Sequence, residues 1–232
     1  MNDLGEGLLY FAVFLFSTTL HEAAHAWAAF RGGDLTAYHG GQVSLDPMPH
    51  IRREPIGMVV LPLISVLVSG WPLGFASAPY DPEWAEKYPR RAAWMALAGP
   101  GANFLLLLVA GVALRIGAMS GTFSPPDHIS FGALADSVDP RWAIAGRALS
   151  VVFSMNLLLM AFNLLPFPPL DGSAVLSLGF GPDTARKYQG FLRSTPMLGW
   201  IGLYAAWRLF DFVFDPIFLV AASLLYPGVS YG

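Results

Sequence analysis

The motif His-Glu-Ala-Ala-His at residues 21–25 carries the side chains whose types and spacing best suit chemistry. Residues four apart on an α-helix share one face, so His21 and His25 can hold one metal ion between them. Glu22 lies about 100° around such a helix from His21, close enough to reach a water molecule on that ion. The motif therefore predicts a zinc site with two imidazole ligands and Glu22 as general base.

A zinc ion that activates water has three protein ligands and one open position, so the motif needs a partner elsewhere in the chain. The chain has no cysteine, which leaves His, Asp, Glu or Asn. The best candidate is Asp171, because the three prolines at 166, 168 and 169 cannot continue a helix and must unwind the backbone just before it. The alternative is that Asp171 and Gly172 only form a turn at a helix end. The remaining histidines fall in polar segments and are expected at the surface: His39, His50 and His128.

The chain around these residues has the composition of a membrane protein. Hydrophobic residues make up 55% of its 232 residues and charged residues 12%, about half the charge of an average soluble domain. The aromatic content of 14% excludes a disordered chain, and a net charge of −3 argues against nucleic-acid binding. Ionisable residues inside an apolar segment cost about 2–3 kcal/mol each, so His21, Glu22 and His25 are expected to be functional.

Four apolar stretches are long enough to be membrane helices, which need about 20 residues each: 8–30, 92–114, 148–165 and 197–214. A short apolar end at 216–226 is separated from the last of these by Pro216. Prolines and glycines interrupt the stretch 56–75, which predicts a broken or re-entrant element there. The alternating residues near 36–46 allow a short β-hairpin. We predict an all-α polytopic membrane protein with about four to six transmembrane segments, in which residues 1–232 form one membrane-embedded domain.

The proposed ligands constrain how the chain crosses the membrane. The motif at 21–25 lies in the second half of its segment, and Asp171 follows the end of 148–165, so these two helices must run in the same direction. One full crossing between them, 92–114, satisfies this if 56–75 enters and leaves on one side. Nine basic residues then share the side of the site, against three on the other, which predicts that the site faces the cytoplasm. The nine are Arg31, Arg52, Arg53, Lys87, Arg90, Arg91, Arg186, Lys187 and Arg193.

Three motifs in this order on hydrophobic segments carry a family resemblance: HEAAH, then AGPGAN at 98–103, then NLLPFPPLDG at 163–172. Together they resemble the site-2 protease family of intramembrane zinc metalloproteases, in its compact prokaryotic branch, over residues 8–176. The resemblance implies one zinc ion per chain, bound by His21, His25 and Asp171, with Glu22 as base. It also implies that Asn163 and Asn103 bind the substrate or order the site.

The resemblance further implies a substrate and a location. The substrate would be a membrane protein with a single transmembrane helix, such as a membrane-tethered transcription regulator, an anti-sigma factor or a signal-peptide remnant. The location would be a prokaryotic inner membrane. Two departures from the family pattern, Asp46-Pro47 and the loop at 75–79, concern substrate handling and not the ligands.

Two other functions stay open at this point. One is a zinc-binding membrane scaffold without peptidase activity, against which the intact Glu22 argues, because a structural zinc site needs no base. The other is an ion or proton transporter that uses His21, Glu22 and His25 as a relay. Transporters often contain repeated halves, and none is visible in this sequence.

Overall fold

The computed structural model describes residues 4–229 and residue 231. Three helices in it are long and apolar enough to cross a membrane: α1 (Leu4–Gly32), α6 (Pro89–Met119) and α7 (Ala143–Asn163), the last preceded by the short turn η2 (Pro140–Trp142). The predicted all-α polytopic architecture is confirmed. The fourth predicted segment forms the helix α10 (Met197–Leu225), which carries charged residues such as Arg208 and Asp211 and is not among those three.

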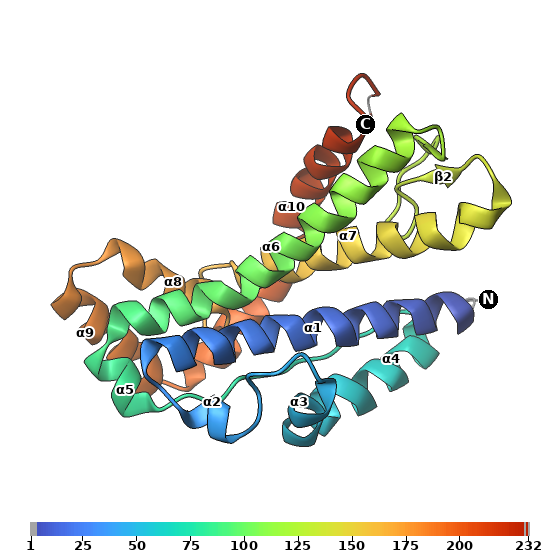
Figure 1. Ribbon diagram of the computed structural model, residues 1–232. Helices are drawn as coiled ribbons and strands as arrows, with labels where there is room; N and C mark the ends of the chain where they lie inside the picture. Colours follow the sequence, from blue (N-terminus) through green and yellow to red (C-terminus); the bar gives the residue numbers. More distant parts are fainter. Residues whose placement is uncertain (1–3, 230, 232) are drawn as a thin grey trace.

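The three long helices form the centre of the molecule, and α6 packs against both of the others (Figure 1). Helices α1 and α7 run in the same direction and α6 runs in the opposite one, as a metal site shared by α1 and the end of α7 requires. Val13 and Phe14 of α1 are buried against Val151 and Met155 of α7. This packing fixes the distance between the two helices that deliver the candidate ligands.

The predicted broken element at 56–75 is a helix followed by an extended return. A π-helical turn η1 (Ile56–Val60) continues into α4 (Leu61–Ser69), and the chain then reverses at Gly70, whose φ of +74° suits glycine. The returning backbone is hydrogen-bonded to the start of this helix: the Phe75 amide donates to the Gly57 carbonyl at 3.1 Å. Fourteen helical residues reach only about 21 Å, short of the ~30 Å of a bilayer core. The segment therefore returns to the end from which it started (Figure 1).

Replacing Gly57 with alanine is expected to destabilise this re-entrant element. A Cβ at this position would overlap the Phe75 carbonyl oxygen and come to 2.8 Å of the Phe75 ring, so the return must move. We expect a loss of about 1–3 kcal/mol of unfolding free energy. Gly190→Ala, on α9 (Pro182–Ser194), is the matched control: no described atom lies within 4 Å of its added Cβ. It should stabilise the chain by up to about 1 kcal/mol. Thermal unfolding in detergent measures both, and equal shifts would contradict the close approach.

The predicted β-hairpin near 36–46 is wrong. The structure has two short helices around this segment, α2 (Thr36–His39) and α3 (Pro47–Arg53). Local hydrogen bonds decide this. The carboxylate of Asp34, one residue before the N-cap of α2, accepts from the Thr36 amide. Asp46 is the N-cap of α3 and accepts from the Met48 amide, with Pro47 in the first helical turn. These bonds outweigh the alternation of side chains that suggested strands. The strands that the structure does contain, β1 (Phe123–Ser124) and β2 (Asp136–Ser137), pair antiparallel in the loop between α6 and α7.

Two smaller expectations also fail. His50 is not at the surface but 1% exposed on α3, where its Nε2 donates to the Ser44 carbonyl. Pro216 does not end the last apolar helix, because it lies inside α10. The residues beyond it, including Ala222 and Leu225, are buried against α6 and α7, and this packing keeps the segment helical past the proline.

The remaining helices gather at one end of the long helices (Figure 1). The short helix α5 (Pro82–Lys87) precedes α6, and its Trp84 donates from Nε1 to the carbonyl of Gly32 at the end of α1. After α7 come α8 (Asp171–Val175), η3 (Leu176–Gly179) and α9, which lie beside the start of α6. This end carries the end of α1 and the start of α8, and these two helices hold the candidate ligands.

Candidate metal centre

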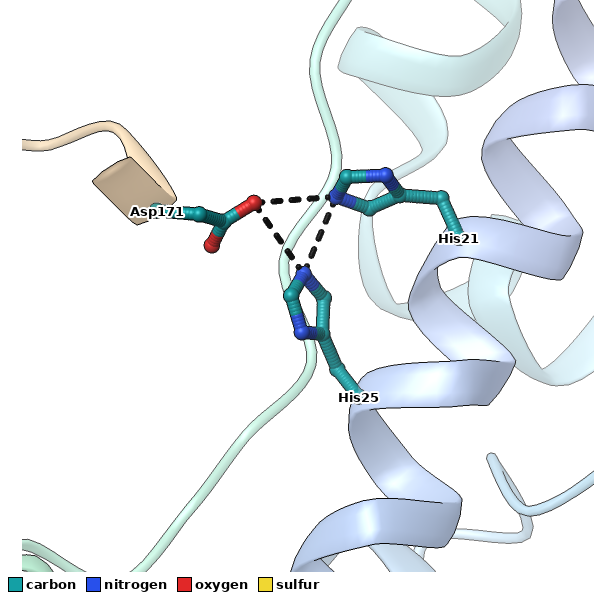
Figure 2. Close-up of side chains that lie close together, drawn as sticks. All are labelled: His21, His25 and Asp171. Carbon is teal, nitrogen blue, oxygen red and sulfur yellow. Dashed lines mark hydrogen bonds and ion pairs between the residues drawn. The ribbon is translucent and has the colours of Figure 1, made fainter. Parts of the chain in front are cut away.

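His21, His25 and Asp171 meet at one point between α1 and α8 (Figure 2). The two Nε2 atoms lie 2.9 Å apart. Asp171 Oδ2 lies 3.2 Å from His21 Nε2 and 3.3 Å from His25 Nε2. Two residues one turn apart on a helix thus meet a carboxylate from 146 or more positions later in the chain, so the cluster depends on the tertiary fold.

Asp171 reaches the cluster because the chain turns sharply after α7. The helix ends at Asn163, the proline-containing segment follows, and α8 begins at Asp171 itself. Gly172 lies directly on this turn: a Cβ there would overlap the carbonyl oxygens of Leu164 and Leu165. The Asp171-Gly172 pair is therefore more than a turn at a helix end, since the glycine permits the close contact that aims the aspartate at α1.

Hydrogen bonds on the far side of each imidazole set how the rings face the cluster. His25 Nδ1 lies 2.7 Å from the Met95 carbonyl, which can only accept, so Nδ1 carries the proton and Nε2 presents its lone pair. His21 Nδ1 lies 2.6 Å from Asn103 Oδ1, an acceptor as well, which gives His21 the same tautomer. Such outer hydrogen bonds are usual for histidines that bind metals.

The three inward-facing atoms fit a divalent cation. With both imidazoles neutral, two lone pairs and a carboxylate oxygen converge on one point, an arrangement that a cation stabilises. Their separations of 2.9 to 3.3 Å are near the ~3.3 Å between ligands of a tetrahedral zinc ion with bonds of about 2.0–2.2 Å. The space beside them is kept by Gly99 of α6, whose added Cβ would overlap His25 Nε2 and come to 2.5 Å of His21 Nε2. Nitrogen and carboxylate ligands in this geometry suit zinc, with other divalent metals as competitors.

Electrostatics at Asp171 favour the charged form that a metal requires. Burial raises the pKa of this carboxyl, but without a cation the positive charge of a protonated His25 and hydrogen bonds from both imidazoles lower it more, so the net pKa is well below its usual value. Asp171 is therefore a carboxylate at neutral pH and offers an anionic ligand to the cluster.

Glu22 lies in the same turn of α1 and is 5% exposed. Its Oε2 is buried and has no hydrogen-bond partner among the residues that the structure describes. Burying a carboxylate oxygen without a partner costs free energy. A role for Glu22 as a general base, which receives a proton from a water molecule at the site, explains why this oxygen has no partner.

The two asparagines predicted by resemblance differ in their surroundings. Asn103 contacts His21 directly, as stated above. Asn163 donates from Nδ2 to the Leu159 carbonyl on its own helix and makes no hydrogen bond to a candidate ligand within residues 4–229. Its role in binding substrate stays a prediction.

Sequence reasoning missed Gly99 as a neighbour of the cluster. A usable signal was present, because Gly99 and Asn103 are four residues apart and therefore share a face of α6, as His21 and His25 do on α1.

Comparison with known proteins gives relatives over most of the chain. The protein "Putative zinc metalloprotease YwhC" of Bacillus subtilis is 27% identical over 224 residues, which cover 92% of this chain and 90% of that protein. "Putative zinc metalloprotease Rip2" of Mycolicibacterium smegmatis is 28% identical, over 96% of this chain and 81% of its own. "Putative zinc metalloprotease Rip2" of Mycobacterium tuberculosis is 29% identical, over 78% of this chain and 61% of its own. No family model and no solved structure matches the chain. The chain is thus a homologue of proteins named as zinc metalloproteases, in agreement with its resemblance to the site-2 protease family.

Proposed function

We propose that this chain is an intramembrane zinc metalloprotease, which hydrolyses a peptide bond in or near a transmembrane segment of a membrane-bound substrate. The observation that carries the proposal is the convergence of His21, His25 and Asp171 beside a buried, unpartnered Glu22, on a helix long enough to cross a membrane. The names of the homologues support the metalloprotease activity. The position of the motif within an apolar helix supports the intramembrane setting.

His21, His25 and Asp171 would hold the zinc ion. When bound, zinc lowers the pKa of its water from about 15.7 to about 7 and polarises the scissile carbonyl. Glu22 accepts the proton of the attacking water and delivers it to the amine that leaves. Met95 and Asn103 keep the two imidazoles in the orientation that binding requires.

The substrate that fits this site is an extended segment from a single transmembrane helix. A helical substrate hides its carbonyl groups in its own hydrogen bonds, so it must unwind locally before water can attack. A membrane-tethered regulator, an anti-sigma factor or a signal-peptide remnant meets this description. Cleavage of such a substrate would be a step of regulated intramembrane proteolysis.

We also propose that the site faces the cytoplasm of a prokaryotic cell, from a multi-pass protein in its inner membrane. Basic residues at the end with α5 and α9 are held in place by local contacts. Arg91 donates to the Gly32 carbonyl, Arg186 donates to the Glu86 carbonyl, and Arg193 lies 3.8 Å from the Glu86 carboxylate. The excess of basic residues near this end supports a cytoplasmic orientation.

Elemental analysis of the detergent-purified chain tests the metal site. We expect about one zinc per chain in the wild type and loss of most of it in Asp171→Ala, because two imidazoles alone leave the site a ligand short. Asp183→Ala, which removes an exposed carboxylate on α9, is the control and should keep its zinc. Cleavage of a single-helix substrate should stop on chelation and return when zinc is added. Full zinc in Asp171→Ala would contradict the three-ligand site.

A further inference from the structure

A chain of buried side chains connects the candidate ligand His21 to two other helices and back to α1. Asn103 of α6 receives the contact from His21 Nδ1 on its Oδ1 and donates from Nδ2 to Asn156 Oδ1 of α7 at 2.9 Å. Asn156 in turn donates from Nδ2 to Ser17 Oγ of α1 at 3.0 Å. Ser17, Asn103 and Asn156 are each 0% exposed. Because Ser17 is one helical turn before His21, the chain closes into a ring across three helices.

The direction of every hydrogen bond in this ring is determined at one place. Asn156 Nδ2 also donates to the Val152 carbonyl at 2.8 Å, and a backbone carbonyl can only accept. The amide nitrogen of Asn156 must therefore lie on that side, which turns its oxygen toward Asn103. Asn103 must then direct its own amide nitrogen to Asn156 and its oxygen to His21. The Val152 carbonyl thus determines, through two amides, that His21 carries its proton on Nδ1.

The reverse orientation of Asn103 would disable the ligand. Its amide nitrogen would then face His21 Nδ1, which would have to become the acceptor, and the proton would move to Nε2. That proton would point at Asp171 and the cation site, where a lone pair is required. The reversed amide would also bring two oxygens, those of Asn103 and Asn156, face to face in a buried place.

We propose that Asn156 is a positioning residue of the metal centre: through Asn103, it holds His21 in the tautomer and ring orientation that bind the cation. The inference rests on the metal site proposed above and extends it to a residue beyond the three candidate ligands and Glu22. This role also differs from packing. Asn156 determines which group donates and which accepts in the hydrogen bond between His21 and Asn103. The substitution Asn103→Asp tests this role. Both oxygens of a carboxylate accept hydrogen bonds, so one of them faces His21 Nδ1 whichever way the group is turned.

The experiment measures binding of Co²⁺ and Zn²⁺ to the full chain in detergent, by the visible absorption of bound Co²⁺ and by its displacement with Zn²⁺. Removing an outer hydrogen-bond partner of a metal ligand typically weakens binding about 10- to 100-fold. We expect Asn103→Leu and Asn156→Leu to lose affinity in this range. Asn103→Asp should lose less affinity than Asn103→Leu, because one carboxylate oxygen still accepts from His21 while the other faces Asn156 Oδ1. In the Asn103→Asp background, Asn156→Leu should add no further loss, because the acceptor at His21 no longer depends on Asn156 and the facing oxygen of Asn156 is removed.

Ser150→Ala is the control, since it removes a buried polar side chain from the same helix, with the same kind of bond to the carbonyl four residues earlier, outside the ring. It should bind Co²⁺ as the wild type does. Thermal unfolding of the metal-free variants separates positioning from folding. Two results would overturn the inference and indicate packing alone. One is that Asn156→Leu lowers metal affinity equally in the wild type and in Asn103→Asp. The other is that Asn103→Asp and Asn103→Leu lower metal affinity equally. Absence of metal from the wild type would instead overturn the proposed site, and unchanged affinity in Asn156→Leu would overturn the positioning role by itself.

Discussion

Glu22→Gln is expected to reduce peptide-bond hydrolysis by about 10²- to 10⁴-fold while the zinc content stays unchanged. Glutamine has the size and shape of glutamate, so the packing of α1 is preserved. Its neutral amide cannot accept the proton of the attacking water, and the unpartnered Oε2 is the atom that loses this function. The cation is held by His21, His25 and Asp171, which the substitution does not touch.

The measurement is cleavage of a single-helix substrate by the full chain in proteoliposomes, with zinc quantified in the same preparations. Glu83→Gln, on the exposed side of α5, is the matched control and should keep both activity and zinc. Wild-type cleavage rates in Glu22→Gln would show that Glu22 is not the base. Loss of zinc from this variant would show that Glu22 is needed to build the site. A scaffold would keep its biological effect in Glu22→Gln, which separates that function from proteolysis.

The parts of this structure that sequence predicts well are those determined within a few residues. The spacing of HEAAH places His21 and His25 on one face of a helix whatever surrounds it. The prolines before Asp171 forbid a helix there, so the unwound approach to the site is also a local property. The prolines and glycines of 56–75 break that segment in the same way, and the re-entrant course follows because the helix is too short to cross.

The parts that sequence does not reveal depend on how helices are rotated against each other. Gly99 borders the cation site only because one face of α6 meets α1 at the level of His21 and His25. Nothing near Asn156 in the sequence indicates that it reaches Asn103. The hairpin near 36–46 was predicted from alternation, whereas the carboxylates of Asp34 and Asp46 give the backbone helix starts instead.

Gly99→Ala is expected to weaken cation binding at the site, by up to about 100-fold. The added Cβ would overlap His25 Nε2 and lie 2.5 Å from His21 Nε2, so it occupies the space beside both ligand atoms. Overpacking a filled interior costs about 1–3 kcal/mol, and the upper value corresponds to about 100-fold in binding. Here the strain falls on the two imidazoles, because the backbone of α6 packs against α1.

Gly101→Ala is the control for this variant, because it lies two residues away on α6 and no described atom is within 4 Å of its added Cβ. Both substitutions replace a helical glycine by alanine, so both gain about 0.8–1.0 kcal/mol of helix propensity. Any difference in Zn²⁺ affinity between them therefore comes from the contact with His21 and His25. Equal affinities would mean that α6 does not border the site, whereas loss confined to Gly99→Ala would place the cation between α1 and α6.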